Sequence, residues 1–93
     1  MNYVYVLEAE KDHRFYLGHS SDLRKRLETH NAGKNRSTKY SKWRLVYYEA
    51  YRSLEYARQR EASLKRNERM RSLLYKRIKT SLEAEQFSGG GSS

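Results

Sequence analysis

The backbone of this chain has few positions at which it can turn freely. The sequence contains no proline, and before its Gly/Ser-rich end the only glycines are Gly18 and Gly33. Glycine reaches positive φ at no steric cost, so turns and helix ends favour it. We therefore expect Gly18 to end a strand and Gly33 to follow the end of a helix.

Two aromatic and β-branched runs near the start of the chain predict a β-hairpin. They cover residues 3–7 and 14–18, and the polar residues between them predict a short loop. Because side chains alternate along a strand, Tyr3, Tyr5 and Leu7 are expected to share one face.

A third run, over residues 45–51, is apolar or aromatic at nearly every position. Strands of this kind are usually covered on both faces, so we expect it to be the central strand of a sheet. Residues 34–43 are basic and polar without a clear period, which predicts a loop.

Helices are predicted on either side of the third run. Capping side chains precede the first two, at residues 20–22 and at Ser53. The predicted helices cover residues 23 to about 32, 54 to about 66, and 68 to about 79. The resulting order is ββαβαα, an α+β fold.

The length of the chain allows one domain. Chains of 93 residues bury too little surface for a catalytic domain and a separate substrate domain. We place the domain at residues 1–80. Residues 81–93 end in a Gly/Ser segment typical of flexible linkers, including linkers added in protein engineering, and we expect them to form a flexible tail.

Several classes of protein are excluded by what the sequence lacks. Without cysteine there is no disulfide, thiolate metal site or cysteine nucleophile. No apolar run approaches the roughly 18 residues of a membrane span, and the first residues do not resemble a signal peptide. We expect a soluble cytoplasmic protein and assume a monomer.

Positive charge is concentrated in two regions. The chain has 20 Lys and Arg against 11 Asp and Glu, a net charge of +9. Residues 24–44 hold eight basic residues and one acidic residue, and residues 52–79 hold ten basic and three acidic. A regional imbalance of this kind indicates a surface that binds a phosphate backbone.

Two charged residues are expected on the apolar faces of their helices. Helical spacing places Glu61 between Ala57 and Leu64, and places Arg26 on or beside the stripe that includes Leu23. A carboxylate can hold Mg²⁺ and an arginine can bind a phosphate, so the pattern indicates a possible metal-dependent nuclease. Pairing or snorkelling of each charge is the alternative.

A series of motifs resembles the GIY-YIG nuclease domain, over residues 3 to about 78. The motifs are Tyr3-Val4-Tyr5, Tyr16-Leu17-Gly18, residues 22–31, Gly33-Lys34, Ser37-Thr38-Lys39, residues 43–49 and residues 57–61. The small stand-alone members of the family are the most similar. Tyr3 and Val4 replace the Gly and Ile of the family name, and Leu17 replaces its second Ile.

The resemblance implies a three-stranded antiparallel sheet flanked by helices. It also implies cleavage of nucleic acid phosphodiester bonds with one divalent cation, Mg²⁺ or Mn²⁺. DNA is the expected substrate and RNA the alternative, with weak sequence specificity and a role in DNA repair. The catalytic residues carried over are Tyr5, Tyr16, Arg26, His30 and Glu61, with Glu61 as the metal ligand.

The implied mechanism requires Tyr5 to act as a base. Tyr5, aided by His30 or Tyr16, would take a proton from water while Arg26 holds the phosphate. A phenol with a pKa near 10 is a weak base at pH 7, so we expect nearby positive charge to lower the pKa of Tyr5. Further contacts with nucleic acid are expected from Arg24, Lys25, Lys34, Arg36, Lys39, Arg58 and Lys65.

Two other functions remain open. One is a DNA- or RNA-binding module on the same fold that does not cleave, although an inward Glu61 has no purpose there. The other is a small basic RNA-associated protein in which Tyr40 and Trp43 stack on bases. For Trp43 we favour a role in anchoring the preceding loop on the sheet.

Overall fold

The computed structural model describes residues 1–33 and 41–91, with the backbone alone for residues 86–91. Three strands and three helices lie in these residues, in the predicted order ββαβαα. The elements are β1 (Asn2–Ala9), β2 (Phe15–Ser20), α1 (Leu23–Asn31), β3 (Trp43–Tyr51), α2 (Leu54–Arg66) and α3 (Glu68–Gly91). The predicted α+β fold is confirmed.

The strands form an antiparallel sheet in the order β2-β1-β3, so the central strand is β1. The prediction that the third run is central was wrong. Val4, Tyr5, Val6 and Leu7 on β1 are at most 2% exposed, whereas most of β3 is only half-buried. The aromatic residues of β3 include tyrosines, whose polar hydroxyls make an edge strand with one wet face acceptable.

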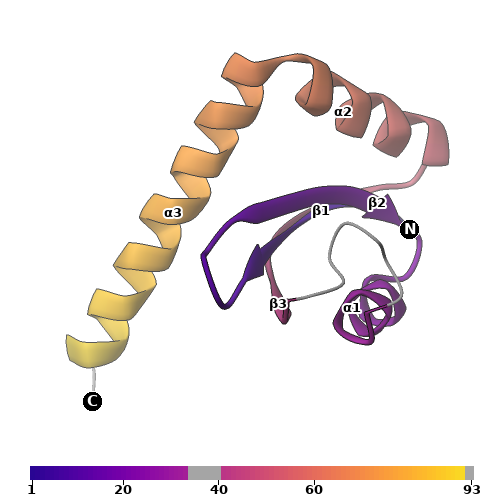
Figure 1. The fold of residues 1–93 in the computed structure, drawn as a ribbon. Helices are drawn as coiled ribbons and strands as arrows, with labels where there is room; N and C mark the ends of the chain where they lie inside the picture. Colours follow the sequence, from indigo (N-terminus) through magenta and orange to yellow (C-terminus); the bar gives the residue numbers. More distant parts are fainter. Residues whose placement is uncertain (34–40, 92–93) are drawn as a thin grey trace.

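Each face of the sheet has its own apolar core, and helices cover both (Figure 1). On one face Val4, Val6 and Leu17 pack with α2 and α3. On the other, Tyr5 and Leu7 pack with α1, as their alternation along the strand predicts. The sheet therefore separates α1 from the other two helices.

The helix ends agree with the sequence signals. The side chain of Asp22 accepts a hydrogen bond from the Lys25 N–H, and Ser53 accepts from the N–H groups of Glu55 and Tyr56. Both capping positions are confirmed. Gly33, with φ of 75°, directly follows the α1 C-cap, so its predicted role is also confirmed.

The turn between β1 and β2, residues 10–14, is closed by two backbone hydrogen bonds. The Ala9 N–H donates to the Arg14 carbonyl and the His13 N–H donates to the Ala9 carbonyl, each at 2.9 Å. His13 adopts the left-handed conformation with φ of 61°, which histidine tolerates better than most residues. The hairpin thus turns without glycine.

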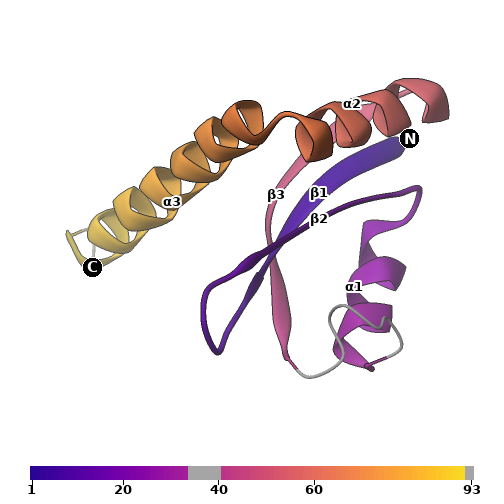
Figure 2. The ribbon, with the colours of Figure 1, turned by 45° about the horizontal axis from the view of Figure 1, so that its top comes forward.

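Helix α3 is longer than predicted, because it continues to Gly91 instead of ending near Lys79 (Figure 2). Residues 81–85 include good helix formers, and Leu82 packs against the core formed with α2 and α3. The helix therefore continues into the segment that we expected to be a flexible tail. The boundary of the domain at residue 80 stays a prediction.

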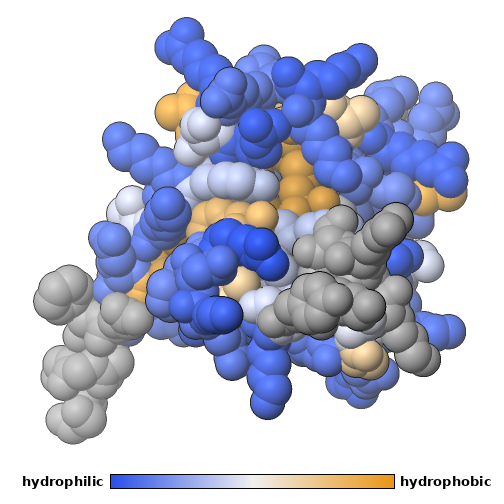
Figure 3. Space-filling view, viewed as in Figure 1, coloured by the Kyte–Doolittle hydropathy of each residue, from blue (hydrophilic) through white to orange (hydrophobic). Residues whose placement is uncertain are grey.

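The surface seen in Figure 3 is mostly hydrophilic, with apolar residues showing in the band where α2 and α3 approach the sheet. Within residues 1–33 and 41–91, no helix combines the length and the apolar character that crossing a membrane requires.

Candidate active site

Tyr5 lies in the middle of β1 with its ring over Gly18 of the neighbouring strand. The two residues are directly paired in the sheet. A Cβ atom on residue 18 would lie 2.6 Å from the Tyr5 Oη and 2.7 Å from its Cζ, closer than real contacts allow. Gly18 is therefore required for close packing inside β2, and not as the strand end that we expected.

The Tyr5 hydroxyl contacts His30 of α1. Its Oη lies 3.0 Å from the His30 Nε2, and both side chains are buried. Tyr16 of β2 packs edge-on against the same imidazole, with ring centroids 4.8 Å apart. Three of the five predicted catalytic residues thus form one cluster between the sheet and α1.

Burial lowers the pKa of His30 below its ordinary value of 6.5, and the nearby charge of Arg26 lowers it further. The imidazole is therefore neutral at pH 7, and one ring nitrogen accepts while the other carries the proton. His30 can accept the Tyr5 proton through Nε2 in this state.

The pKa of Tyr5 is raised, which contradicts our expectation. Burial is the main cause, and the neighbouring Tyr16 adds to it; Arg26 acts in the opposite direction, and Glu61 again raises the pKa. The positive charge of Arg26 is too weak to offset the loss of solvation of a phenolate under the α1 helix. Tyr5 is thus a neutral hydroxyl at pH 7.

Arg26 lies at the edge of this cluster. It is exposed, in agreement with a position beside the apolar stripe of α1. Its charge nevertheless acts on both Tyr5 and His30. Among the described residues it forms no ion pair, so its guanidinium is available to an anion from solution.

Glu61 approaches from α2, across β2 from the cluster, and its partner is a residue that the sequence did not indicate. The Nδ1 of His19 lies 3.0 Å from the Glu61 Oε1, and the Lys65 Nζ lies 3.8 Å from the Oε2. The Glu61 side chain is 16% exposed. Its inward position, predicted from helical spacing, is confirmed.

His19 could have been found from strand alternation. Leu17 and His19 share a face of β2, and Leu17 packs with the core beneath α2. A histidine on the face that meets an inward glutamate is a candidate partner for that glutamate. His19 is not among the catalytic residues that the family resemblance implies.

The donor set around Glu61 fits a hydrated magnesium ion better than a closed metal site. The described residues contain no group of three or more His, Asp or Glu side chains able to surround a metal. Mg²⁺ retains several waters and is often held by only one or two carboxylates. Glu61 can meet that requirement as a single protein ligand.

The predicted nucleic-acid contacts divide into two groups. Arg24 and Lys25 on α1 and Arg58 and Lys65 on α2 are exposed, and Lys65 also contacts Glu61. Lys34, Arg36 and Lys39, like Tyr40, lie outside the described residues.

Trp43 is an anchor, as favoured above. It is 4% exposed and packs with Tyr5 and Leu7. The Asn31 side chain at the end of α1 accepts from the Trp43 N–H at 2.7 Å and donates to the Trp43 carbonyl at 3.1 Å. These two hydrogen bonds hold the end of α1 against the start of β3.

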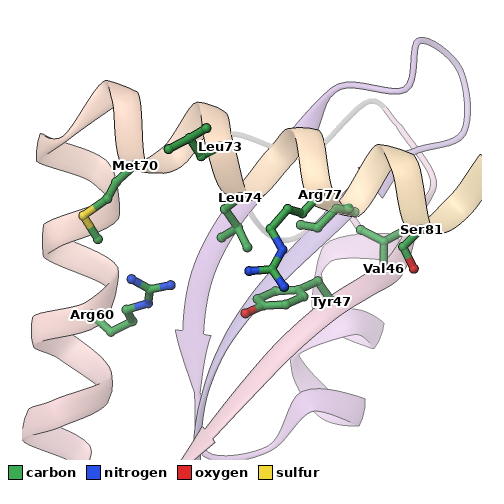
Figure 4. A pocket seen from close by; sticks show the side chains of 9 residues that line it. Val46, Tyr47, Arg60, Met70, Leu73, Leu74, Arg77 and Ser81 are labelled. Atoms are coloured by element: carbon green, nitrogen blue, oxygen red, sulfur yellow. The ribbon is translucent and has the colours of Figure 1, made fainter.

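A pocket of about 450 Å³ lies elsewhere, between β3 and the helices α2 and α3 (Figure 4). Arg77 extends from α3 toward Tyr47 there, while Arg60 is bound to Glu49 at 2.9 and 3.0 Å. None of the predicted catalytic residues lines it. The chemistry of the chain is therefore expected around β2 and not in this pocket.

The fold and the side chains around β2 define a small, basic domain of the nuclease type. A model of the GIY-YIG catalytic domain matches residues 1–81. Since this match covers most of the chain, the chain belongs to the GIY-YIG nuclease family.

Similar proteins are small as well. UPF0213 protein SpyM50708 of Streptococcus pyogenes serotype M5 is 46% identical over 78 residues, covering 78% of this chain and 82% of that protein. UPF0213 protein MGAS10270_Spy1222 of serotype M2 matches equally well. The solution structure of UPF0213 protein BH0048 from Bacillus halodurans is 35% identical, with a TM-score of 0.50, covering 82% of this chain and 84% of that one.

Proposed function

We propose that this protein is a divalent-metal-dependent endonuclease that hydrolyses phosphodiester bonds, in DNA before RNA, with weak sequence specificity. The observation that supports the proposal best is the contact of Tyr5 with a neutral His30, beside an exposed Arg26. A hydroxyl that can pass its proton to an imidazole next to a phosphate-binding cation suits hydrolysis by water.

The raised pKa of Tyr5 favours a proton relay over a phenolate base. As water attacks phosphorus, the Tyr5 Oη takes a proton from the water and its own proton moves to the His30 Nε2. The new P–O bond forms while the bond to the 3′ oxygen breaks. The departing oxygen takes a proton from solvent, and His30 afterwards releases the proton that it gained to solvent. Tyr5 and His30 are therefore neutral both before and after the reaction.

Arg26 and Glu61 lie on opposite sides of this relay. In the proposed mechanism the Arg26 guanidinium holds the two non-bridging oxygens of the phosphate in a bidentate geometry. Glu61, whose carboxylate contacts His19, is the proposed ligand of the divalent cation. Once bound, Mg²⁺ or Mn²⁺ supplies positive charge that stabilises the leaving 3′ oxygen.

The test is cleavage of supercoiled plasmid with Mg²⁺, with Mn²⁺ and with EDTA, by the wild type and by Glu61→Gln. The matched control is Glu55→Gln, because Glu55 is an exposed carboxylate on the same helix. We expect nicking by the wild type and by Glu55→Gln, and none by Glu61→Gln. Binding without cleavage by the wild type would instead establish the non-catalytic module.

The same assay on single strands, flaps, junctions and RNA addresses the substrate. We expect cleavage products spread over many sequences, because exposed lysines and arginines contact phosphates, which carry no sequence information. A single preferred cleavage sequence would contradict weak specificity. Sedimentation at assay concentrations tests the monomer that we assume.

A further inference from the structure

The face of the sheet that holds Tyr5 also carries an aromatic pair that α1 does not cover. In the sheet register, Gly18, Tyr5 and Tyr48 lie side by side across β2, β1 and β3. Tyr3, two residues before Tyr5, is on the same face. The rings of Tyr3 and Tyr48 meet edge to face, with centroids 5.8 Å apart and planes at 74°.

This pair is accessible, unlike the rest of the face. Helix α1 packs its leucines on the half of the face that holds Leu7 and Trp43. Tyr48 is 55% exposed, and Ala50, the partner of Tyr3 on β3, is also exposed and presents only a methyl group. The Tyr48 ring therefore has open space beside it.

We propose that Tyr48, held by Tyr3, is a stacking platform for an unpaired base of the nucleic acid strand, a few nucleotides from the scissile phosphate. The proposal rests on the proposed function for where the strand lies. Tyr48 is one strand away from the Tyr5 backbone, but the Tyr5 hydroxyl lies over Gly18, one strand further on, so Tyr48 and the hydroxyl are roughly 10 Å apart. This is about three nucleotide steps along a strand with a rise of about 3.4 Å per nucleotide.

Charge and ring geometry support a base as the occupant. Arg26 lies on the Tyr5 side of the row, and the exposed Arg52 follows directly after β3, where its carbonyl accepts from Asn2. A strand whose phosphates contact these cations would bring a base over Tyr48. Aromatic faces accept any base, so this platform adds affinity without adding sequence preference.

A base inside a duplex already stacks on its neighbours, so the platform favours single-stranded, frayed or flapped substrates. Affinity for an unpaired strand should therefore depend on Tyr48, whereas affinity for a fully paired duplex should depend mainly on the basic residues.

The test uses a single-stranded oligonucleotide with one 2-aminopurine, and the fully paired duplex of the same sequence, in EDTA so that no cleavage occurs. The proteins are the wild type, Tyr48→Ala, Tyr48→Trp and, as control, Tyr56→Ala, since Tyr56 is 63% exposed on α2. Circular dichroism confirms that each variant is folded.

We expect Tyr48→Ala to lower single-strand affinity by roughly 5- to 150-fold, with a smaller loss on the duplex and loss of the 2-aminopurine quenching. Tyr48→Trp and Tyr56→Ala should retain the single-strand affinity and the 2-aminopurine quenching of the wild type. An unchanged ratio of single-strand to duplex affinity in Tyr48→Ala overturns the proposal. This experiment measures binding and not cleavage. If the wild type never cleaves but Tyr48→Ala still lowers the ratio of single-strand to duplex affinity, the proposed function is contradicted and the stacking platform is not.

Discussion

The imidazole of His19 and the carboxylate of Glu61 meet between β2 and α2, with Nδ1 3.0 Å from Oε1, although 42 residues separate them in the chain. His19 of β2 thereby orients one oxygen of the Glu61 carboxylate. The Lys65 Nζ lies 3.8 Å from the other oxygen. Partners of this kind hold a metal ligand in the geometry that the metal requires.

His19→Ala is therefore expected to weaken metal binding and cleavage by about 10- to 100-fold. His19→Asn should recover much of the loss, because the asparagine amide N–H lies close to where Nδ1 was. Electron paramagnetic resonance of bound Mn²⁺, together with cleavage against Mg²⁺ concentration, measures both effects. The control is His13→Asn in the β1–β2 turn. Normal Mn²⁺ affinity in His19→Ala would show that the contact is only structural.

Tyr5→Phe is expected to reduce cleavage by roughly 10²- to 10⁴-fold, since it removes the hydroxyl of the proposed relay. Nucleic acid binding should be retained, because Arg26 and the exposed lysines remain. Single-turnover cleavage and fluorescence anisotropy separate the two. Cleavage at the wild-type rate by Tyr5→Phe would exclude Tyr5 from the relay.

Cleavage should fall at acid pH as His30 gains a proton. The pKa of His30 is lowered by burial and by Arg26, so the fall should be centred below 6.5 and activity should be flat around pH 7. The lowered pKa also means that the folded state loses stability as pH falls through 6.5, because the unfolded chain binds the proton first. Rates should therefore be measured well below the melting temperature, and urea denaturation of His30→Gln should lack this loss of stability. A midpoint above 6.5 would contradict the neutral imidazole.

Gly18→Ala should reduce both stability and cleavage. The added Cβ would lie 2.6 Å from the Tyr5 Oη, so either β2 or the Tyr5 ring must move. We expect a loss of about 1–3 kcal/mol in the free energy of unfolding, measured with urea, and a marked loss of activity. Gly33→Ala is the matched control: its positive φ costs stability, but its position after α1 leaves the relay intact. Full activity in Gly18→Ala would mean that the Tyr5 ring need not lie over this strand.

Glu49 links β3 to α2 and should contribute to stability in a pH-dependent way. Burial by itself would raise the pKa of Glu49, but hydrogen bonds from Arg60, Tyr47 and Tyr51 outweigh it and lower the pKa. A lowered carboxyl pKa stabilises the fold above the unfolded value of about 4.5, and this contribution is lost as pH falls through the folded value.

Glu49→Gln should therefore cost about 1–3 kcal/mol at pH 7 and less near pH 3, which lies below the unfolded pKa. Urea denaturation at the two pH values measures the difference, with the exposed Glu55→Gln as control. An equal cost at both pH values would mean that the ionised carboxylate contributes no extra stability.

Local signals in the sequence were sufficient for most of the fold. The capping side chains of Asp22 and Ser53 and the apolar stripes predicted the helix starts and the inward Glu61, because these depend on neighbours in the chain. The position of β3 at an edge depends instead on how strands pair, and a run of aromatics does not reveal that. Helix α3 was predicted too short because its Gly/Ser end was weighted above the helix formers at residues 81–85.

The inward position of Glu61 was predicted from the sequence, but the electrostatics of Tyr5 was not. Nearby positive charge, from Arg26 and a bound metal ion, was expected to lower the pKa of Tyr5, and the charge of Arg26 alone does not lower it. The outcome depends on how deeply the phenol is buried beneath α1, a tertiary quantity that the sequence does not contain. The contact of His19 with Glu61 likewise forms only when α2 folds back on β2.

The length of the five-residue turn between β1 and β2 fixes the pairing register of the two strands, and with it the positions of the proposed catalytic groups. None of the five residues has a proposed catalytic role. Side chains alternate with a period of two, so a shift in pairing by one residue would place Tyr5 opposite a side chain instead of Gly18. The same shift would turn His19 away from Glu61. Surface turns usually tolerate insertions. In this hairpin an insertion that changed the register would separate the proposed proton relay from the proposed metal ligand without altering a single side chain of either.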